Sequence, residues 1–191
     1  MIVESTERLD FAFIKQLGSN FIPVEFGISD WLDFNIFHPI PGIAKKYDCI
    51  MVCDWFNYKR HYALLRALSK IKEYGLKAIL VSNAKGNMDT LKNIARYFGV
   101  QDSITFLQRL PPEKLNVIYN ESKGNLLLSY KEGANKTLFE GMHANIPTIL
   151  IKNNIGVNKR YVNDETGKLI DEKDLPKTLL MFSREYAKFN H

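Results

Sequence analysis

Two glutamates, Glu132 and Glu140, stand on either side of an expected helix start, with seven residues between them. The segment 125–129 before them is a short apolar run, typical of a buried strand, and a polar turn with one glycine, Gly133, follows. A helix start carries roughly half a positive charge and unpaired amides, which suit a phosphate. Carboxylates accept hydrogen bonds from hydroxyl groups. The pattern therefore indicates a ligand with hydroxyls at both ends and phosphates between them, and a nucleotide-sugar fits that description.

The helix that carries Glu140 is one unit of a strand–helix alternation that begins near residue 47. The expected strands span 47–53, 78–82, 104–107, 126–129 and 148–152. The expected helices span 58–74, 89–98, 112–120, the segment around Glu140, and 175–188. Alternation of this kind predicts an α/β fold, with a Rossmann-like parallel sheet that has helices on both faces.

In such a sheet, ligands bind outside the carboxyl ends of the strands. The segments that follow the first four expected strands are 54–59, 83–87, 108–110 and 129–137. They contain the polar side chains that we single out below. We therefore expect these four segments to meet around one site.

The first forty residues have a different pattern. We expect a strand at 2–5, a helix at 7–17, a strand at 21–26 and an aromatic-rich loop at 27–40. Pro39, Pro41 and Gly42 then interrupt the pattern. The sequence thus predicts an N-terminal segment and linker, residues 1–40, that packs onto a nucleotide-sugar-binding domain formed by residues 41–191.

The composition places limits on the class of protein. A charged fraction of 25% and a hydrophobic fraction of 46% are ordinary for a globular domain. The net charge is +5, but the lysines are spread along the chain, and neither an aromatic–basic RNA-binding pattern nor zinc-ligand spacing occurs. We therefore expect no nucleic-acid partner. The positive charge favours an anionic donor or peripheral contact with a negatively charged membrane.

The location of the protein is predicted from three absences in the sequence. There is no run of eighteen apolar residues and no signal-peptide pattern at the N-terminus. Cys49 and Cys53 are expected on one face of a strand, about 13 Å apart, which is too far for a disulfide. We expect a cytoplasmic protein in which both cysteines are small buried apolar residues.

Four motifs in the right order resemble one known family, the retaining glycosyltransferases of group 1 (family 4), which have the GT-B fold. Residues 129–149 read SYKEGANKTLFEGMHANIPTI, where the family has S-x-x-E-G-F-G-x-x-x-x-E-A-M-A-x-G-x-P-V-I. Residues 50–68 resemble V-G-R-x-x-x-x-K-G-x-x-x-L-x-x-A-L. Residues 104–119, which end at Tyr119, resemble V-x-F-L-G-x-x-x-x-x-E-L-x-x-x-Y, and 164–170 resemble N-G-x-L-V. The resemblance covers about residues 39–180, so it implies one half of a GT-B fold, the C-terminal donor-binding domain.

The resemblance also implies roles for the motif residues. Glu140 would accept hydrogen bonds from the ribose hydroxyls, and Glu132 would be the catalytic residue that meets the donor sugar near the transferred carbon. Lys59 would pair with the diphosphate. The remaining nucleotide-sugar-binding residues would be the turn and helix start, which hold the distal phosphate, and the pair that offers backbone groups to the base: Gly133, Ala134, Asn135, Lys136, Thr137, Arg109 and Leu110.

The chain departs from the family at the diphosphate. Asp54 stands where the family has an arginine that, together with the lysine, binds the two phosphates. An aspartate there would repel a diphosphate. Either another cation such as Arg60, Lys85 or Lys136 takes over, or diphosphate binding is weak. We expect no metal and no other cofactor, because the sequence has no Asp-x-Asp pair to hold a metal against the diphosphate.

Two functions of different classes follow from these observations. The first is the donor-binding half of a glycosyltransferase that moves a hexose from a UDP- or GDP-type sugar to a hydroxyl with retention. Its N-terminal acceptor domain would be supplied by another part of the molecule or by a partner chain, so the isolated domain would be inactive alone. The second, suggested by Asp54, is a non-catalytic subunit that binds a sugar-nucleotide or a partner.

Overall fold

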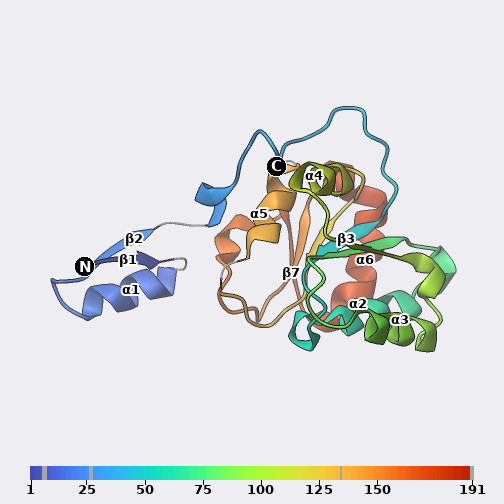
Figure 1. The fold of residues 1–191 in the computed structure, drawn as a ribbon, viewed down its shortest axis with the longest axis horizontal. Helices are drawn as coiled ribbons and strands as arrows, with labels where there is room; N and C mark the ends of the chain where they lie inside the picture. Colours follow the sequence, from blue (N-terminus) through green and yellow to red (C-terminus); the bar gives the residue numbers. More distant parts are fainter. Residues whose placement is uncertain (6–7, 26–27, 134, 190–191) are drawn as a thin grey trace.

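A computed structural model of the chain describes residues 1–5, 8–25, 28–133 and 135–189 (Figure 1). Within these residues, the main body is built on a six-stranded sheet in the order β5-β4-β3-β6-β7-β8, in which every neighbouring pair is parallel. The strands are β3 (Cys49–Val52), β4 (Ala78–Ser82), β5 (Ile104–Gln108), β6 (Asn125–Leu127), β7 (Thr148–Ile151) and β8 (Gly167–Ile170). The predicted Rossmann-like parallel sheet is confirmed.

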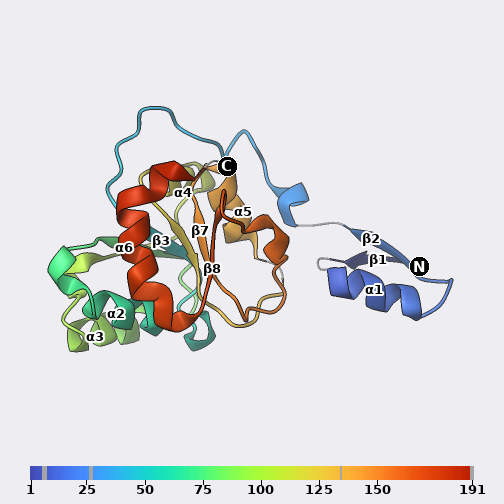
Figure 2. The same ribbon diagram turned by 180° about the vertical axis from the view of Figure 1, so that it is seen from behind.

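Helices cover both faces of this sheet. They are α2 (His61–Ser69), α3 (Met88–Tyr97), α4 (Pro112–Asn120), α5 (Lys136–His143) and α6 (Leu175–Glu185). Helices α2, α3 and α6 lie on one face, while α4 and α5 lie on the other, as Figures 1 and 2 show from opposite sides. A strand buried on both faces has apolar side chains in unbroken runs, and the residues of β4 and β7 are all buried.

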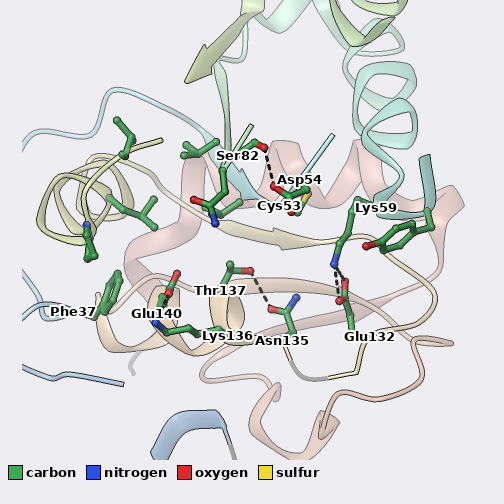
Figure 3. A pocket seen from close by; sticks show the side chains of 17 residues that line it. Phe37, Cys53, Asp54, Lys59, Ser82, Glu132, Asn135, Lys136, Thr137 and Glu140 are labelled. Atoms are coloured by element: carbon green, nitrogen blue, oxygen red, sulfur yellow. Dashed lines mark hydrogen bonds and ion pairs between the residues drawn. The ribbon is translucent and has the colours of Figure 1, made fainter. Parts of the chain in front are cut away.

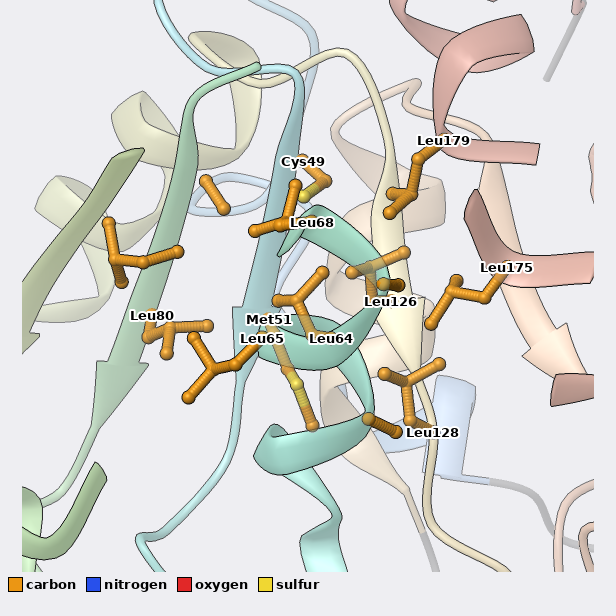
Figure 4. Packing of buried hydrophobic residues seen from close by; sticks show 14 of the residues in the cluster. Cys49, Met51, Leu64, Leu65, Leu68, Leu80, Leu126, Leu128, Leu175 and Leu179 are labelled. Atoms are coloured by element: carbon orange, nitrogen blue, oxygen red, sulfur yellow. The ribbon is translucent and has the colours of Figure 1, made fainter. Parts of the chain in front are cut away.

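Alternate residues of each strand enter different clusters of the core. Met51 and Leu126 belong to the cluster that contains Leu64 of α2 and Leu179 of α6 (Figure 4). Ile50, which lies next to Met51 in β3, enters the cluster on the opposite face. Burying a side chain of this size stabilises the fold by roughly 1.5–3 kcal/mol. The two clusters therefore fix which face each strand residue occupies, and with it the register of the sheet.

One predicted helix is shorter than expected. The sequence predicted a helix over 58–74, but α2 covers only His61–Ser69, with separate 3₁₀ turns at Asn57–Lys59 and Lys72–Tyr74. The break occurs because Arg60 adopts a left-handed conformation with φ of 65°. This break separates Lys59 from the helix and places it in the loop at the carboxyl end of β3.

The N-terminal residues form a small βαβ unit. It consists of β1 (Ile2–Ser5), α1 (Arg8–Gln16) and β2 (Ile22–Glu25), and its two strands pair in parallel. In both views the unit lies at one end of the molecule, beside the main body (Figures 1 and 2). Leu32 and Phe37, which follow it, are buried in the core on the α4–α5 face. The division at residue 40 stays a prediction.

Two further findings concern the cysteines and the helices of the described residues. Cys49 and Cys53 are both free; Cys49 is buried in β3 as predicted, whereas Cys53 is only partly buried and follows the end of that strand. None of the helices in the described ranges combines the length and the apolarity that crossing a bilayer requires.

Candidate functional site

A pocket of about 410 Å³ lies at the carboxyl ends of the strands (Figure 3). Strands β3 and β6 are neighbours in the sheet there, although β4 and β5 come between them in the sequence. At such a switch point the connections leave in opposite directions and open a crevice, which is where α/β sheets bind ligands. The described lining comes from the ends of β3 and β4, the loops after β3, β4, β5 and β6, helices α4 and α5, and one residue of the N-terminal segment: Phe37, Val52, Cys53, Asp54, Tyr58, Lys59, Val81, Ser82, Asn83, Leu110, Pro112, Leu115, Glu132, Asn135, Lys136, Thr137 and Glu140.

Glu132 is buried at one end of the pocket and is held from two sides. Lys59 Nζ lies 2.9 Å from Glu132 Oε1 and 2.7 Å from Oε2, so it donates to both carboxylate oxygens. The hydroxyl of Ser129 donates to Oε1 as well. Only 9% of Glu132 is exposed, so both charges of this pair are largely withdrawn from water. The structure thus joins two residues that the sequence assigned to different parts of a ligand.

Glu140 lies toward the other end of the pocket, on α5. Tyr119, which is fully buried in α4, donates its hydroxyl to Glu140 Oε2 at 3.1 Å. Lys136 Nζ lies 3.7 Å from Oε1. Burial raises the pKa of Glu140, while the Tyr119 hydrogen bond and the Lys136 charge oppose that rise. Glu132 and Glu140 therefore each have one hydroxyl donor and one lysine.

The start of α5 lies between the two carboxylates. Asn135 caps the helix, because its Oδ1 accepts the amide of Leu138 at 2.8 Å and the hydroxyl of Thr137 at 3.0 Å. The first amides of a helix have no partner within it, and the positive end of the helix dipole points the same way. Asn135, Lys136 and Thr137 all line the pocket, as Figure 3 shows. This wall of the pocket can therefore receive an anion.

The remaining predicted residues are distributed unevenly. Leu110 lines the pocket, whereas Arg109 is exposed and is not among the described lining residues. The Arg109 backbone amide donates to the carbonyl of Ser82, so in this structure Arg109 holds its own loop through a backbone hydrogen bond. Gly133 is exposed and also lies outside the described lining. Ala134 lies outside the described residues.

Asp54 makes the pocket more acidic than the family pattern. Its Oδ1 accepts a hydrogen bond from the hydroxyl of Ser82 at 3.1 Å. Of the cations proposed as substitutes, Lys136 lines the pocket, while Arg60 is buried and pairs with Glu172. Among the described lining residues, three carboxylates thus face two lysines, and one of those lysines already pairs with Glu132.

Several described residues of the site had no role in the sequence-based interpretation. Tyr119 and Ser129 were each part of a quoted motif but received no function. Phe37 comes from the segment assigned to residues 1–40, and nothing in its neighbourhood in the sequence signals a pocket. The ring of Phe37 lies 6.2 Å from that of Tyr119 and 6.0 Å from Lys136 Nζ. It therefore closes the pocket beside Glu140.

The described residues can also be compared with what a metal ion needs, which is several nearby histidine, cysteine or carboxylate ligands. In the part of the chain that the structure describes, no group of three or more histidine, cysteine, aspartate or glutamate side chains could hold a metal ion.

Comparison with protein families decides the identity of the domain. The family described as glycosyl transferases group 1 matches residues 33–180, most of the chain. The chain belongs to this glycosyltransferase family. The match confirms the resemblance that the four motifs indicated. No curated protein sequence is similar enough to this chain to count as a match.

Solved structures show the same fold in other proteins. The C-terminal domain of LpcC, a group 1 glycosyltransferase from Francisella tularensis, is 20% identical, with a TM-score of 0.67 over 83% of this chain and 91% of that one. Sucrose-phosphate synthase from Thermosynechococcus elongatus is 17% identical, with a TM-score of 0.73 over 98% of this chain and 50% of its own. HepE from Anabaena, solved with UDP and glucose, is 16% identical, with a TM-score of 0.72 over 98% of this chain and 54% of its own.

These comparisons identify which part of the fold the chain contains. It covers nearly all of an isolated C-terminal domain but about half of the length of the two longer proteins. Its parallel sheet with helices on both faces therefore has the fold of the C-terminal domain of LpcC, a group 1 glycosyltransferase.

Proposed function

We propose that this domain binds the donor of a retaining glycosyltransferase, a hexose carried on UDP or GDP. The observation that carries the proposal is the arrangement of two buried carboxylates on either side of a helix start in one pocket, each with a hydroxyl donor and a lysine. Glu140 would accept hydrogen bonds from the ribose. Glu132 would meet the sugar near the transferred carbon, and the start of α5 would face the phosphates.

The apolar part of the pocket supports a place for the base. Leu110, Pro112 and Leu115 line it together with Phe37, near Glu140. A nucleobase needs an apolar surface on its faces, and a ribose attached to it would then lie within reach of the Glu140 carboxylate. HepE, whose structure contains UDP and glucose, has the same fold, which favours UDP as the first nucleotide to test.

Binding should be tested with a panel of UDP, GDP and ADP and their glucose derivatives by thermal shift. A ligand that binds only the folded state raises the melting temperature in proportion to the logarithm of its concentration over its dissociation constant. We expect a diphosphate nucleotide to stabilise the wild-type chain and to stabilise Glu140→Gln much less. Glu113→Gln is a matched control, because Glu113 is an exposed glutamate on α4 outside the described pocket. Equal shifts in all three proteins would contradict the proposal.

We also propose that no metal is needed. The same panel repeated with a chelator should give unchanged shifts, because helix amides and lysines would meet the phosphate charge. Loss of the shift in chelator, with recovery on adding magnesium, would contradict this part of the proposal.

The acceptor side would come from a second domain, in the same molecule or in a partner chain. This chain spans about half of HepE and of sucrose-phosphate synthase, whose remaining residues have no counterpart here. The βαβ unit also exposes apolar side chains: Ile2, Phe13, Leu17, Ile22 and Val24. A two-stranded parallel sheet with exposed apolar residues is typical of a fragment of a larger sheet.

A non-catalytic role as a sugar-nucleotide-binding subunit is the second candidate. It is favoured by Asp54 at the position of the family's arginine and by the pairing of Lys59 with Glu132. A fusion of this chain to the part of HepE that it does not cover separates the two functions. Transfer of glucose from UDP-glucose by the fusion, lost in Glu132→Gln, would support the enzyme. Nucleotide binding without transfer would support the subunit.

A further inference from the structure

The loop that follows β7 holds the turn that carries Glu132. The Glu132 backbone amide donates to the carbonyl of Ile155 at 2.8 Å, and the Ile155 amide donates to the carbonyl of Tyr130 at 2.7 Å. The side-chain amide of Asn154 donates to the carbonyl of Ser129 at 2.7 Å. Three hydrogen bonds thus join two loops that lie more than twenty residues apart in the chain.

The backbone at Gly156 brings these two loops into close contact. Its φ is +96°, a conformation that side chains other than glycine rarely adopt. A Cβ atom there would lie 1.7 Å from the carbonyl oxygen of Glu132. The absence of a side chain at Gly156 therefore lets the loop lie directly against the backbone of Glu132.

Asn154 is the buried side chain of this contact. It is fully buried, and within the described structure its Oδ1 has no hydrogen-bond partner, while its Nδ2 donates to Ser129. A buried amide with an unpaired oxygen is unfavourable for folding, by about 1–3 kcal/mol in typical proteins. An apolar residue of similar size would avoid that penalty. The hydrogen bond from Nδ2 is the compensating interaction that the structure offers.

The hydrogen bonds continue from Asn154 to the Glu132 carboxylate. Asn154 fixes the backbone of Ser129, the Ser129 hydroxyl donates to Glu132 Oε1, and Lys59 donates to both Glu132 oxygens. A hydroxyl can orient a carboxylate only if its own backbone is fixed. Misplacing a group by about 1 Å is enough to weaken its action on a bound substrate strongly.

We propose that Asn154, with Gly156 against the same turn, is a positioning residue for Glu132 and sets how well the pocket holds the sugar of its donor. The inference rests on the proposed function for the role of Glu132, but the network itself is independent of any ligand. Asn154 is not among the described lining residues of the pocket, so it acts through Ser129 and Glu132 and not by touching the sugar.

The ligand-free test is a double-mutant cycle by urea denaturation with Asn154→Ala, Glu132→Gln and the double variant. Residues in one hydrogen-bond network give non-additive effects, whereas independent residues give additive ones. We expect the folding equilibrium constant of the double variant to differ at least fivefold from the product of the single effects. The control cycle uses Asn153→Ala, an exposed neighbouring asparagine, and should be additive within twofold. Additivity in both cycles overturns the proposal, whatever the chain binds.

The ligand test measures UDP and UDP-glucose by calorimetry, well below the melting temperature. We expect the UDP affinity of Asn154→Ala to stay within twofold of wild type. The ratio of the UDP-glucose affinity to the UDP affinity should fall at least fivefold. A merely destabilising substitution would not separate the two ligands. Should Asn154→Ala not fold, Asn154→Ser and Ser129→Ala break the same links with smaller loss of volume. If the ratio of the UDP-glucose affinity to the UDP affinity is unchanged in these variants, the proposal is overturned. If the wild-type chain binds neither ligand, the proposed function is contradicted, and the denaturation cycle alone decides whether Asn154 positions Glu132.

Discussion

Lys59 and Glu132 form a two-point ion pair inside the pocket, although 73 residues separate them in the chain. The resemblance assigns the lysine to the diphosphate and the glutamate to the sugar. In the structure each neutralises the other, and the side chains are only 15% and 6% exposed. A ligand that binds here must therefore share Lys59 with Glu132 or take it over.

We expect Glu132→Gln to bind bare UDP as well as wild type or up to about tenfold better. The substitution removes the negative charge that holds Lys59, so the ammonium is free to meet a phosphate, and a charge-assisted hydrogen bond is worth about 1.5–3 kcal/mol. The extra affinity of UDP-glucose over UDP should fall. Calorimetry with both ligands measures the two effects, and Lys59→Met, which should weaken both ligands, is the comparison. Weaker UDP binding in a folded Glu132→Gln protein would contradict this expectation.

Tyr119→Phe should change the pH range in which the nucleotide binds. The Tyr119 hydrogen bond lowers the pKa of Glu140 against the rise caused by burial, so removing the hydroxyl raises that pKa further. If Glu140 must be ionised to accept the ribose hydroxyls, binding should be lost at a higher pH in the variant as the solution is acidified. At neutral pH, Tyr119→Phe should weaken nucleotide binding by about 1 kcal/mol. Measuring the nucleotide affinity of both proteins from pH 8 to pH 5 tests this. Identical pH profiles for wild type and Tyr119→Phe would contradict a role for Glu140 in ribose binding.

His61 should make the fold sensitive to acid. Burial, and secondarily the charge of Lys59, lower its pKa to about 4. The imidazole contacts the Cys53 thiol, whose pKa burial raises, so both groups are neutral. The pKa of His61 in the folded protein lies below its unfolded value of about 6.5. The neutral imidazole therefore contributes its full stabilisation of the fold above pH 6.5. As the pH falls toward 4 this contribution is lost, which lowers the free energy of unfolding by up to about 3 kcal/mol.

Urea denaturation of His61→Gln tests that assignment. Glutamine cannot take up a proton, so the difference in unfolding free energy between wild type and variant should be largest above pH 6.5 and should shrink on acidification. A difference that stays constant from pH 7.5 to pH 4.5 would show that another group causes the acid sensitivity.

Replacing Asp54 should strengthen diphosphate binding. Asp54→Arg changes the local charge by two, which at a partly solvated site amounts to on the order of 1–3 kcal/mol at low salt. Asp54→Asn, which keeps an oxygen for the Ser82 hydroxyl, should give a smaller gain. The gain should shrink as salt rises and should be smallest for uridine, which has no phosphate. If both variants bind UDP more weakly, the main role of Asp54 is to hold the loop after β4 through Ser82.

The sequence predicted the elements whose signals are local. The bounds of α4, Pro112–Asn120, agree with the prediction because prolines mark its first turn. β8 was missed, since its four residues, Gly167–Ile170, include a glycine and a lysine and read like a loop. The break at Arg60 was also missed, because a left-handed residue other than glycine has no clear sequence signal.

The site was predictable where a motif names the residue, and not where the contact is made across the fold. Glu132 and Glu140 were found by their spacing and Lys59 by the family resemblance, and the structure brings all three to one pocket. Their partners Tyr119 and Ser129 act through contacts that only the packed sheet and helices create. Phe37 reaches the pocket from a segment that the sequence treats as a linker.

The order of strands has a consequence for how the protein assembles. β3 and β6 join the two halves of the sheet through the registered pair Ile50–Asn125, while β3 and β4 share four such pairs. The pocket spans this joint, with Lys59 on one side and Glu132 on the other. Each half can form its own local contacts early, because those contacts are close in sequence, but the pocket exists only after the halves have docked. A bound nucleotide would therefore stabilise the docked arrangement of the two halves, which forms in the last step of folding. Amide hydrogen exchange at Ile50 and Asn125 should slow when the nucleotide binds.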